Sequence, residues 1–206
     1  VVMDTKDNIM SSLTSVFQTM IAAIVISMVI IWMFFGDIKA SLIVGSSIPV
    51  SILASFVLMN LMGFSLNVIT LSALVLGVGM MVDNSINVLD GCFRAKEKMN
   101  FYDAAIEGSR TMIGAITGGT VTTCVVFIPL AFLQGMTGQM FKPMGYTIVF
   151  CMMSSLLSAM TVVPLCYLMY KPKETERAPM NRPVVHMQNL YRKIMGKLLG
   201  HRLIVM

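Results

Sequence analysis

Charged residues are scarce in this sequence of 206 residues: Asp, Glu, Lys and Arg together make up 12% of it. That is about half of the share that a soluble domain carries. Hydrophobic residues make up 56%, and the mean hydropathy is +0.81. A chain with so little charge cannot hide its apolar surface by folding on itself in water. We therefore expect the lipid bilayer to be its solvent.

The sequence also lacks the residue patterns of enzymes. Its two histidines, His186 and His201, lie in or beside the charged C-terminal tail, so no apolar run offers a Ser–His pair. There is no phosphate-binding loop and no HExxH motif. An intramembrane aspartyl protease needs carboxylates on two facing helices, whereas Asp83 and Asp90 lie on one predicted helix. These absences predict that the chain is not an enzyme.

Metal and cofactor motifs are missing as well. The four cysteines stand singly without CxxC spacing, and the 22 methionines have no His or Cys partner at ligand spacing. We expect no metal and no cofactor. The net charge of +5 does not indicate nucleic acid either. Lys and Arg lie in the connections between apolar runs, without the interleaved aromatic residues of a single-strand binder.

Long apolar runs dominate what is present. A membrane-spanning helix needs about 20 mostly apolar residues, and five runs meet this requirement: about 17–35, 40–61, 68–89, 112–133 and 144–170. The sequence therefore predicts an all-α integral membrane protein with a transmembrane domain over residues 1–170. Asn67 is expected to cap the third helix. Residues 102–109 are expected to form a short surface helix, and residues 134–143 a loop.

Beyond residue 170 the composition becomes polar. Residues 171–183 hold three prolines and many charges, which is typical of a surface linker. Residues 184–199 have the pattern of an amphipathic helix that lies on a membrane surface, although a short soluble helix is an alternative. The linker and this helix are expected to fill residues 171–200, and residues 201–206 to begin another transmembrane helix. The sequence is thus interpreted as a segment of a longer protein.

Basic residues are distributed unevenly between the two ends of the predicted spans. Thirteen of the 15 Lys and Arg residues lie in alternate connections and in the tail, and only Lys6 and Lys142 lie on the opposite side. Cytoplasmic loops of membrane proteins carry such an excess of positive charge. We therefore expect loop 90–110 and tail 171–202 to be cytoplasmic.

Asp83 is the one carboxylate placed deep within a predicted span. It is the sixteenth residue of the run that begins at Val68, about 22 Å along that helix. A charge at this depth is costly, and such residues mark proton relays or ion sites. A carboxylate held only by hydrogen bonds of helix packing is the alternative. Asp83 is thus the candidate proton relay.

Residues near Asp83 are candidates for supporting roles. Helical spacing places Gly79, Asp83, Asn87 and Asp90 on one face, while Asn84 points about 100° away from Asp83. Gly79 would let a neighbouring helix approach closely. Asn84 and Asn87 are alternatively hydrogen-bonding groups in helix packing, and Asp90 alternatively lies among the headgroups.

The fourth run is small and hydroxylated on one half. Gly118 and Gly119 suit close contacts between helices. Thr120 and Thr123 either take part in the same packing or line a water path to Asp83.

Several segments resemble the exporters of the resistance–nodulation–division family. The turn at residues 63–67 and the following LVLGVGMMVDNSINVLD (residues 74–90) resemble the family's fourth transmembrane helix. In that helix an essential Asp stands in a G-x-x-x-D-[DN] motif, matched here by Gly79 and Asp83. Residues 117–143 resemble the family's fifth helix and the loop after it, and residues 162–172 resemble the end of the sixth helix. Residues 36–52 resemble the turn between the second and third helices.

This resemblance implies helices two to six of the first half of a multidrug exporter in the bacterial cytoplasmic membrane, with the Asp-Asn pair of the branch found in Gram-positive bacteria. It implies a homotrimer that exports amphiphilic compounds in exchange for protons, with Asp83 as the proton carrier. The partner of Asp83 would be a Lys on the tenth helix, in a second half outside this chain, so the chain alone is not expected to transport. Two positions depart from the family pattern, because Asn84 replaces a second Asp, and Asp90-Gly91 replaces Glu-Asn.

Three other interpretations stay open. The chain could be a relative of the protein-translocation accessory pumps or a sterol-sensing module, both of which are distantly similar to the exporters in helix layout. It could also be a purely structural piece of a membrane assembly. A structural piece needs no pH-dependent change of conformation, so titration of Asp83 separates it from a pump.

Overall fold

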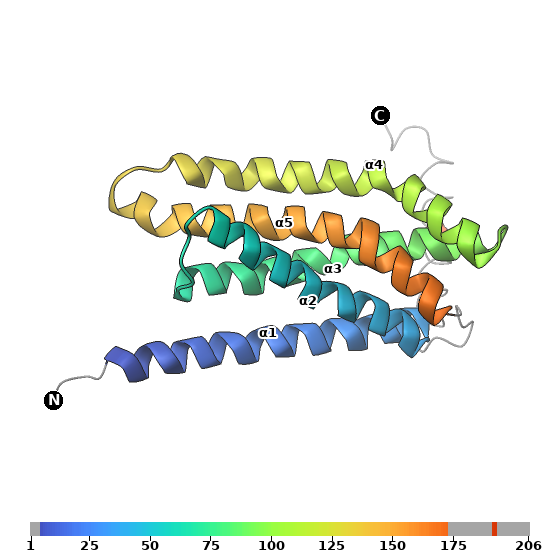
Figure 1. The fold of residues 1–206 in the computed structure, drawn as a ribbon, viewed down its shortest axis with the longest axis horizontal. Coiled ribbons are helices and arrows are strands. Elements are labelled where there is room, and N and C mark those ends of the chain that lie inside the picture. Colours follow the sequence, from blue (N-terminus) through green and yellow to red (C-terminus); the bar gives the residue numbers. More distant parts are fainter. Residues whose placement is uncertain (1–4, 173–190, 193–206) are drawn as a thin grey trace.

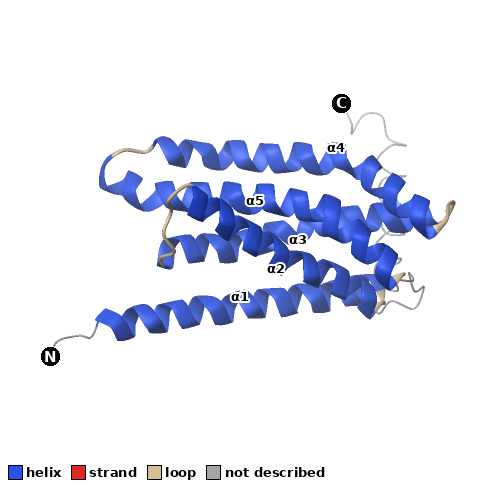
Figure 2. Cartoon of the chain, in the orientation of Figure 1, coloured by secondary structure: helices blue, strands red, loops and turns tan. Residues whose placement is uncertain are grey.

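The computed structural model of the chain describes residues 5–172 and 191–192. Within these residues the chain is built from helices joined by short turns (Figure 2). Five of the helices are long and apolar enough to cross a membrane. In chain order the elements are α1 (Thr5–Phe35), α2 (Ile38–Leu61), α3 (Val68–Lys96), α4 (Phe101–Phe127), the 3-10 helix η1 (Ile128–Phe132) and α5 (Gly135–Tyr170). The prediction of an all-α membrane fold is confirmed.

The C-terminal predictions concern a part of the chain of which little is described. Of the predicted linker and amphipathic helix at 171–200, only residues 171, 172, 191 and 192 belong to the described residues. The predicted start of a further span at 201–206 lies wholly outside them.

Local sequence signals set the starts of the helices. Asp37 caps α2 by accepting a hydrogen bond from the Lys39 amide at 2.9 Å. Asn67 and Thr70 form a reciprocal capping box at the start of α3, with both hydrogen bonds at 2.9 Å. The expected cap at Asn67 is therefore confirmed. Gly63, in the preceding turn, has φ +74°, a backbone conformation that side chains with a Cβ rarely adopt.

The structure differs from the sequence-based expectation at two connections. Residues 102–109 are not a separate surface helix but the first turns of α4, and residues 134–143 are not a loop because α5 begins at Gly135. In both places the chain stays helical beyond the apolar run, since a helix satisfies its backbone hydrogen bonds whatever its surroundings. α3 likewise continues to Lys96, where Arg94 and Lys96 complement the negative end of the helix dipole.

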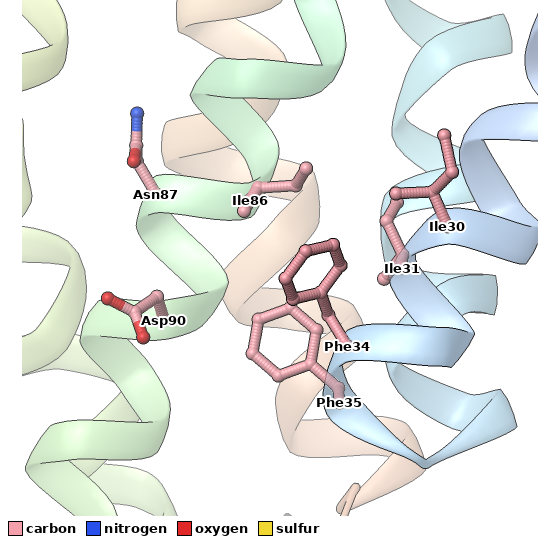
Figure 3. Close-up of a pocket in the computed structure, with 7 residues that line it drawn as sticks. All are labelled: Ile30, Ile31, Phe34, Phe35, Ile86, Asn87 and Asp90. Atoms are coloured by element: carbon pink, nitrogen blue, oxygen red, sulfur yellow. The ribbon is translucent and has the colours of Figure 1, made fainter. Parts of the chain in front are cut away.

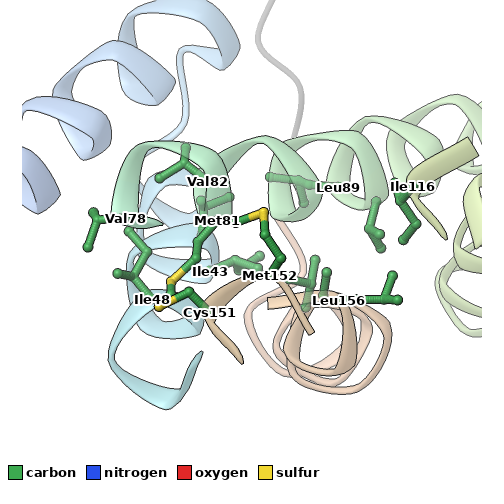
Figure 4. Packing of buried hydrophobic residues seen from close by; sticks show 14 of the residues in the cluster. Ile43, Ile48, Val78, Met81, Val82, Leu89, Ile116, Cys151, Met152 and Leu156 are labelled. Carbon is green, nitrogen blue, oxygen red and sulfur yellow. The ribbon is translucent and has the colours of Figure 1, made fainter. Parts of the chain in front are cut away.

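α3 is the central helix of the bundle. It packs against α1, α2, α4 and α5, whereas α1 packs on α2 and α3 and lies at one edge, with α4 at the other (Figure 1). Ile43 and Ile48 of α2, Met81 of α3, and Cys151 and Met152 of α5 are buried between the three helices (Figure 4). The core therefore lies between α2, α3 and α5, and it covers one side of α3.

The backbones of α3 and α4 approach each other closely where the two helices cross. A Cβ added at Gly108 of α4 would lie 2.6 Å from the backbone N and Cα of Cys92 of α3, and one added at Gly91 would lie 2.7 Å from the Gly108 carbonyl oxygen. The backbones meet here because neither residue has a side chain. This crossing holds α4 against the C-terminal half of α3, which the sequence predicts to lie toward the cytoplasm.

Candidate functional site

One face of α3 is left open by the other helices. Ser72, Leu76, Gly79, Asp83 and Asn87 are exposed, and they recur at every third or fourth position of the helix. The residues between them are mostly buried against the bundle. The face predicted from helical spacing therefore exists, and it points away from the core. We call these five exposed residues the open face of α3.

Asp83 lies near the middle of this open face. Neither a Lys nor an Arg of the described residues forms an ion pair with it, whereas Asp90 and Glu107 both have Arg partners. An uncompensated carboxylate in the hydrocarbon region is costly. The predicted proton-relay role of Asp83 would require that this cost be offset by protonation or by a cation from outside the described residues.

Asp90 lies nearer the C-terminal end of α3 and, unlike Asp83, forms an ion pair. Its Oδ2 lies 2.7 Å from the Arg94 guanidinium, one turn later in α3, and the Asp90 side chain is 38% exposed. This partly exposed ion pair agrees with the headgroup alternative for Asp90. Asn87, one turn before Asp90, lies on the open face.

A cavity of about 280 Å³ adjoins Asn87 and Asp90, between the end of α1 and the C-terminal half of α3. Asn87 and Asp90 supply its polar edge. Figure 3 shows the rings of Phe34 and Phe35 extending from the end of α1 toward Ile86 of α3. The other walls of the cavity are apolar and are formed by Ile30, Ile31, Phe34, Phe35 and Ile86.

Asn84 points into the bundle rather than toward the open face. It is 8% exposed, and its Nδ2 donates to Thr120 Oγ1 of α4 at 3.3 Å and to Ser155 Oγ of α5 at 3.2 Å. Adjacent residues in a helix point in different directions, which is why Asp83 and Asn84 face different surroundings. Asn84 thereby connects the turn that carries Asp83 to two neighbouring helices.

The structure brings only some of the predicted supporting residues together. Thr120 is buried and bonds to Asn84, whereas the Thr123 hydroxyl donates to the Gly119 carbonyl oxygen of its own helix at 3.0 Å. Apart from the glycine's own stretch of helix, no atom of the described chain lies within 4 Å of a Cβ built at Gly79, Gly118 or Gly119. Close packing at these three glycines thus stays a prediction that requires a partner beyond the described residues.

Several serines bond to the core-facing side of the turn that carries Asp83, although sequence reasoning did not select them. Ser155 of α5 accepts from Asn84 and donates to the Met81 carbonyl oxygen of α3 at 3.0 Å. Ser85, two residues after Asp83, lies 2.7 Å from Ser47 of α2. The only signal in the sequence was the presence of serines within apolar runs, which does not by itself distinguish a bond to another helix from one within the same helix.

The described residues around Asp83 include no metal-binding cluster. Residues 5–172 and 191–192 contain no group of three or more His, Cys, Asp or Glu side chains that could bind a metal. Asp83 is thus a single carboxylate on an exposed helix face, and Asn84 behind it bonds to α4 and α5.

Comparison with known proteins gives consistent matches. A model described as the AcrB/AcrD/AcrF family matches residues 1–206. The chain is 31% identical to the swarming motility protein SwrC of Bacillus subtilis, over 97% of this chain and 20% of SwrC. It is 30% identical to the multidrug export protein AcrF of Escherichia coli, over 96% of this chain and 20% of AcrF. It is 33% identical to the toluene efflux pump membrane transporter TtgE of Pseudomonas putida, over 84% of this chain and 17% of TtgE. The chain spans about a fifth of the length of these curated relatives.

Proposed function

The chain belongs to the AcrB/AcrD/AcrF family of resistance–nodulation–division exporters, and on this premise we propose that it forms part of the membrane domain of a proton-driven exporter. The observation that carries the proposal is the position of Asp83, a mid-span carboxylate on an open helix face. Protonation of Asp83 neutralises this face and deprotonation charges it again. The change alters how α3 packs against whatever covers the face.

The substrates of the exporter are amphiphilic or apolar compounds. This part of the proposal is supported by the names of two relatives, a multidrug export protein and a toluene efflux pump. Family members are transporters, so the chain's activity is secondary active transport and not catalysis. Because the chain spans about a fifth of its relatives' length, transport requires the complete protein, in which the chain acts as one part of a homotrimer.

A Lys of the second half of the protein supplies the countercharge for Asp83. The proposal is supported by the absence of any Lys or Arg ion pair to Asp83 within the described residues, and by the open face on which such a partner would pack. A buried carboxylate that meets a cation is stabilised in its charged form. The cation therefore makes proton release possible at a depth where an isolated carboxylate would stay protonated.

The protein lies in the bacterial cytoplasmic membrane with residues 90–110 and 171–202 on the cytoplasmic side. The excess of Lys and Arg in these segments supports this orientation. Lys98, in the turn between α3 and α4, is a suitable position for a test. In intact cells, a Lys98→Cys variant should react with a membrane-impermeant thiol reagent only after the membrane is opened. Efficient labelling from outside would contradict the orientation.

The test of the proton-carrier role is Asp83→Asn in the complete protein. An amide has the shape of a protonated carboxyl but cannot release a proton, so we expect drug resistance to be abolished while the amount of protein in the membrane is unchanged. Asp103→Asn is the matched control, since Asp103 is an exposed carboxylate in the first turn of α4. It should retain resistance. Full resistance in Asp83→Asn would favour the structural alternative.

A further inference from the structure

Most hydroxyl groups in this bundle bond to a carbonyl of their own helix. Ser51 and Ser55 of α2, and Thr147 and Thr161 of α5, each donate to the residue four positions earlier, at 2.7–2.8 Å. This local bond is the usual choice of a serine or threonine within a helix. A hydroxyl that bonds to another helix instead is therefore informative about how the two helices are held together.

The turn of α3 from Met81 to Ser85, which contains Asp83, departs from this pattern. The carbonyl oxygen of Met81, four residues before Ser85, accepts a hydrogen bond from Ser155 Oγ of α5 at 3.0 Å. Ser85 Oγ lies 2.7 Å from Ser47 Oγ of α2. The side chain of Ser85 thus bonds across to α2, and the local acceptor that it would otherwise use is occupied by α5.

The direction of the hydrogen bond between Ser85 and Ser47 follows from the remaining contacts. Ser47 Oγ donates its one proton to the Val44 carbonyl oxygen at 2.7 Å, so Ser85 must be the donor to Ser47. The backbone carbonyl of Ser47 in turn accepts from Ser158 Oγ of α5 at 3.1 Å. These bonds join α2, α3 and α5 in one network.

We call Ser47, Ser85, Ser155 and Ser158 the serine clamp. All four are at most 4% exposed, so no water replaces a bond that is broken, and an unsatisfied buried hydroxyl is costly. The clamp bonds to the side of α3 that faces the core, while Asp83 lies on the open face. Rotation of α3 about its axis would turn the open face, and Asp83 with it, in another direction, and the same rotation would break the clamp.

We propose that Ser85 is a positioning residue for Asp83: by donating to Ser47 it fixes the rotation of α3 on α2 and α5, so that Asp83 stays directed toward the partner that covers the open face. The three clamped helices then move as one unit when Asp83 gains or loses its proton. This inference rests on the proposed proton-carrier role of Asp83.

The pH profile of export by the complete protein tests the positioning role. In Ser85→Ala, Asp83 meets its cationic partner less closely, so its charged form is less stable and proton release requires a higher pH. We expect the pH of half-maximal export to rise by about half a unit. The net free energy of one hydrogen bond is about equal to, or smaller than, the free energy that corresponds to a shift of one pH unit. Thr147→Val is the matched control, since Thr147 is equally buried and its hydroxyl donates to the Pro143 carbonyl oxygen of its own helix. Its profile should match that of the parent protein.

Two further variants keep the test decisive. Ser47→Ala removes the acceptor of the same bond, so it should give a similar shift, and the double variant should shift no further than either single one. A parent-like pH profile in Ser85→Ala and Ser47→Ala would overturn the inference. A loss of export that is equal at every pH and follows the amount of protein in the membrane would overturn it too.

The outcome for Asp83→Asn in the same assay separates the two proposals. If Asp83→Asn abolishes export while Ser85→Ala keeps the parent profile, the proton-carrier role stands and only the positioning role is wrong. If Asp83→Asn retains pH-dependent export, the proton-carrier role itself is wrong.

Discussion

At the scale of single residues, the two neighbours Asp83 and Asn84 have separate tasks. Asp83 is exposed on the open face of α3, and Asn84 is buried and donates to Thr120 and Ser155. Only Asp83 can titrate. Asn84 instead donates to hydroxyl groups of two neighbouring helices, so it belongs to the packing that holds α3 in place.

Substitutions at Asn84 should therefore be milder than Asp83→Asn. Asn84→Ala removes both hydrogen bonds to α4 and α5, at a cost of about 1 kcal/mol for each lost bond, and we expect reduced but measurable drug resistance of cells with the complete protein. A loss as complete as that of Asp83→Asn would mean that the two residues act as one unit.

Asn84→Asp is the informative companion of these variants. A charged Asp has no N–H to donate to Ser155, and two adjacent carboxylates in low-dielectric surroundings do not ionise together easily. We expect export to persist with a shifted pH dependence, measured as resistance over a series of external pH values. An unchanged profile would show that position 84 is electrically remote from the site that couples protons to export.

The sequence predicts Asp83 and its face but not the contacts behind it. A lone carboxylate within an apolar run and the 3.6-residue period suffice to identify Asp83 and to place Gly79 and Asn87 beside it. By contrast, whether Ser85 bonds to its own helix or to Ser47 depends on where α2 lies, and nothing within α3 encodes that. The cross-helix bonds of Ser85 and Ser155 therefore could not be derived from local sequence.

At the scale of helices, length and apolarity predict the spans, whereas the ends depend on other signals. α3 and α5 both extend beyond their apolar runs, to Lys96 and back to Gly135. Hydropathy reports where lipid surrounds the chain, but a helix ends only where capping residues or a positive φ end it. Asn67 gave such a signal and was predicted. Gly135, with φ +73° at the start of α5, could have given another.

Contacts between small residues depend on tertiary structure in the same way. Close contact at Gly118 and Gly119 stays a prediction, whereas the structure brings the backbones of α3 and α4 together at Gly91 and Gly108. Which glycine of a helix faces its neighbour depends on the rotation of both helices, and composition does not record that rotation.

The crossing of α3 and α4 predicts the effect of Gly108→Ala. The added Cβ would meet backbone atoms of Cys92 and Gly91 at 2.6 Å, and backbone cannot move aside as a flexible side chain can. We expect a destabilisation of about 1–3 kcal/mol, typical of overpacking, measured as a lower thermal unfolding midpoint of the purified protein in detergent. Gly118→Ala is the control, because its Cβ meets no atom within 4 Å in the described chain. It should leave the midpoint unchanged or raise it, and equal destabilisation by both variants would argue against this crossing.

At the scale of the whole molecule, the described bundle is closed on one side of α3 and open on the other. α2, α4 and α5 pack on α3 and cover the residues that form the core, while α1 lies at the edge against α2 and α3. The open face carries the mid-span carboxylate Asp83. A charged group in direct contact with lipid is costly, so we infer that another part of the complete protein covers this face.

Gly79 tests that inference, because it lies on the open face one turn before Asp83 and has no atom within 4 Å of its Cβ position in the described chain. If a helix of the second half packs here, Gly79→Leu should push that helix away from Asp83 and abolish drug resistance in the complete protein, with its amount in the membrane retained. Val57→Phe adds bulk at another exposed position, on α2 (Val57 is 59% exposed), and should be tolerated. Normal resistance in Gly79→Leu would mean that lipid, and not protein, covers this part of α3, and Asp83 would then need another source for its countercharge.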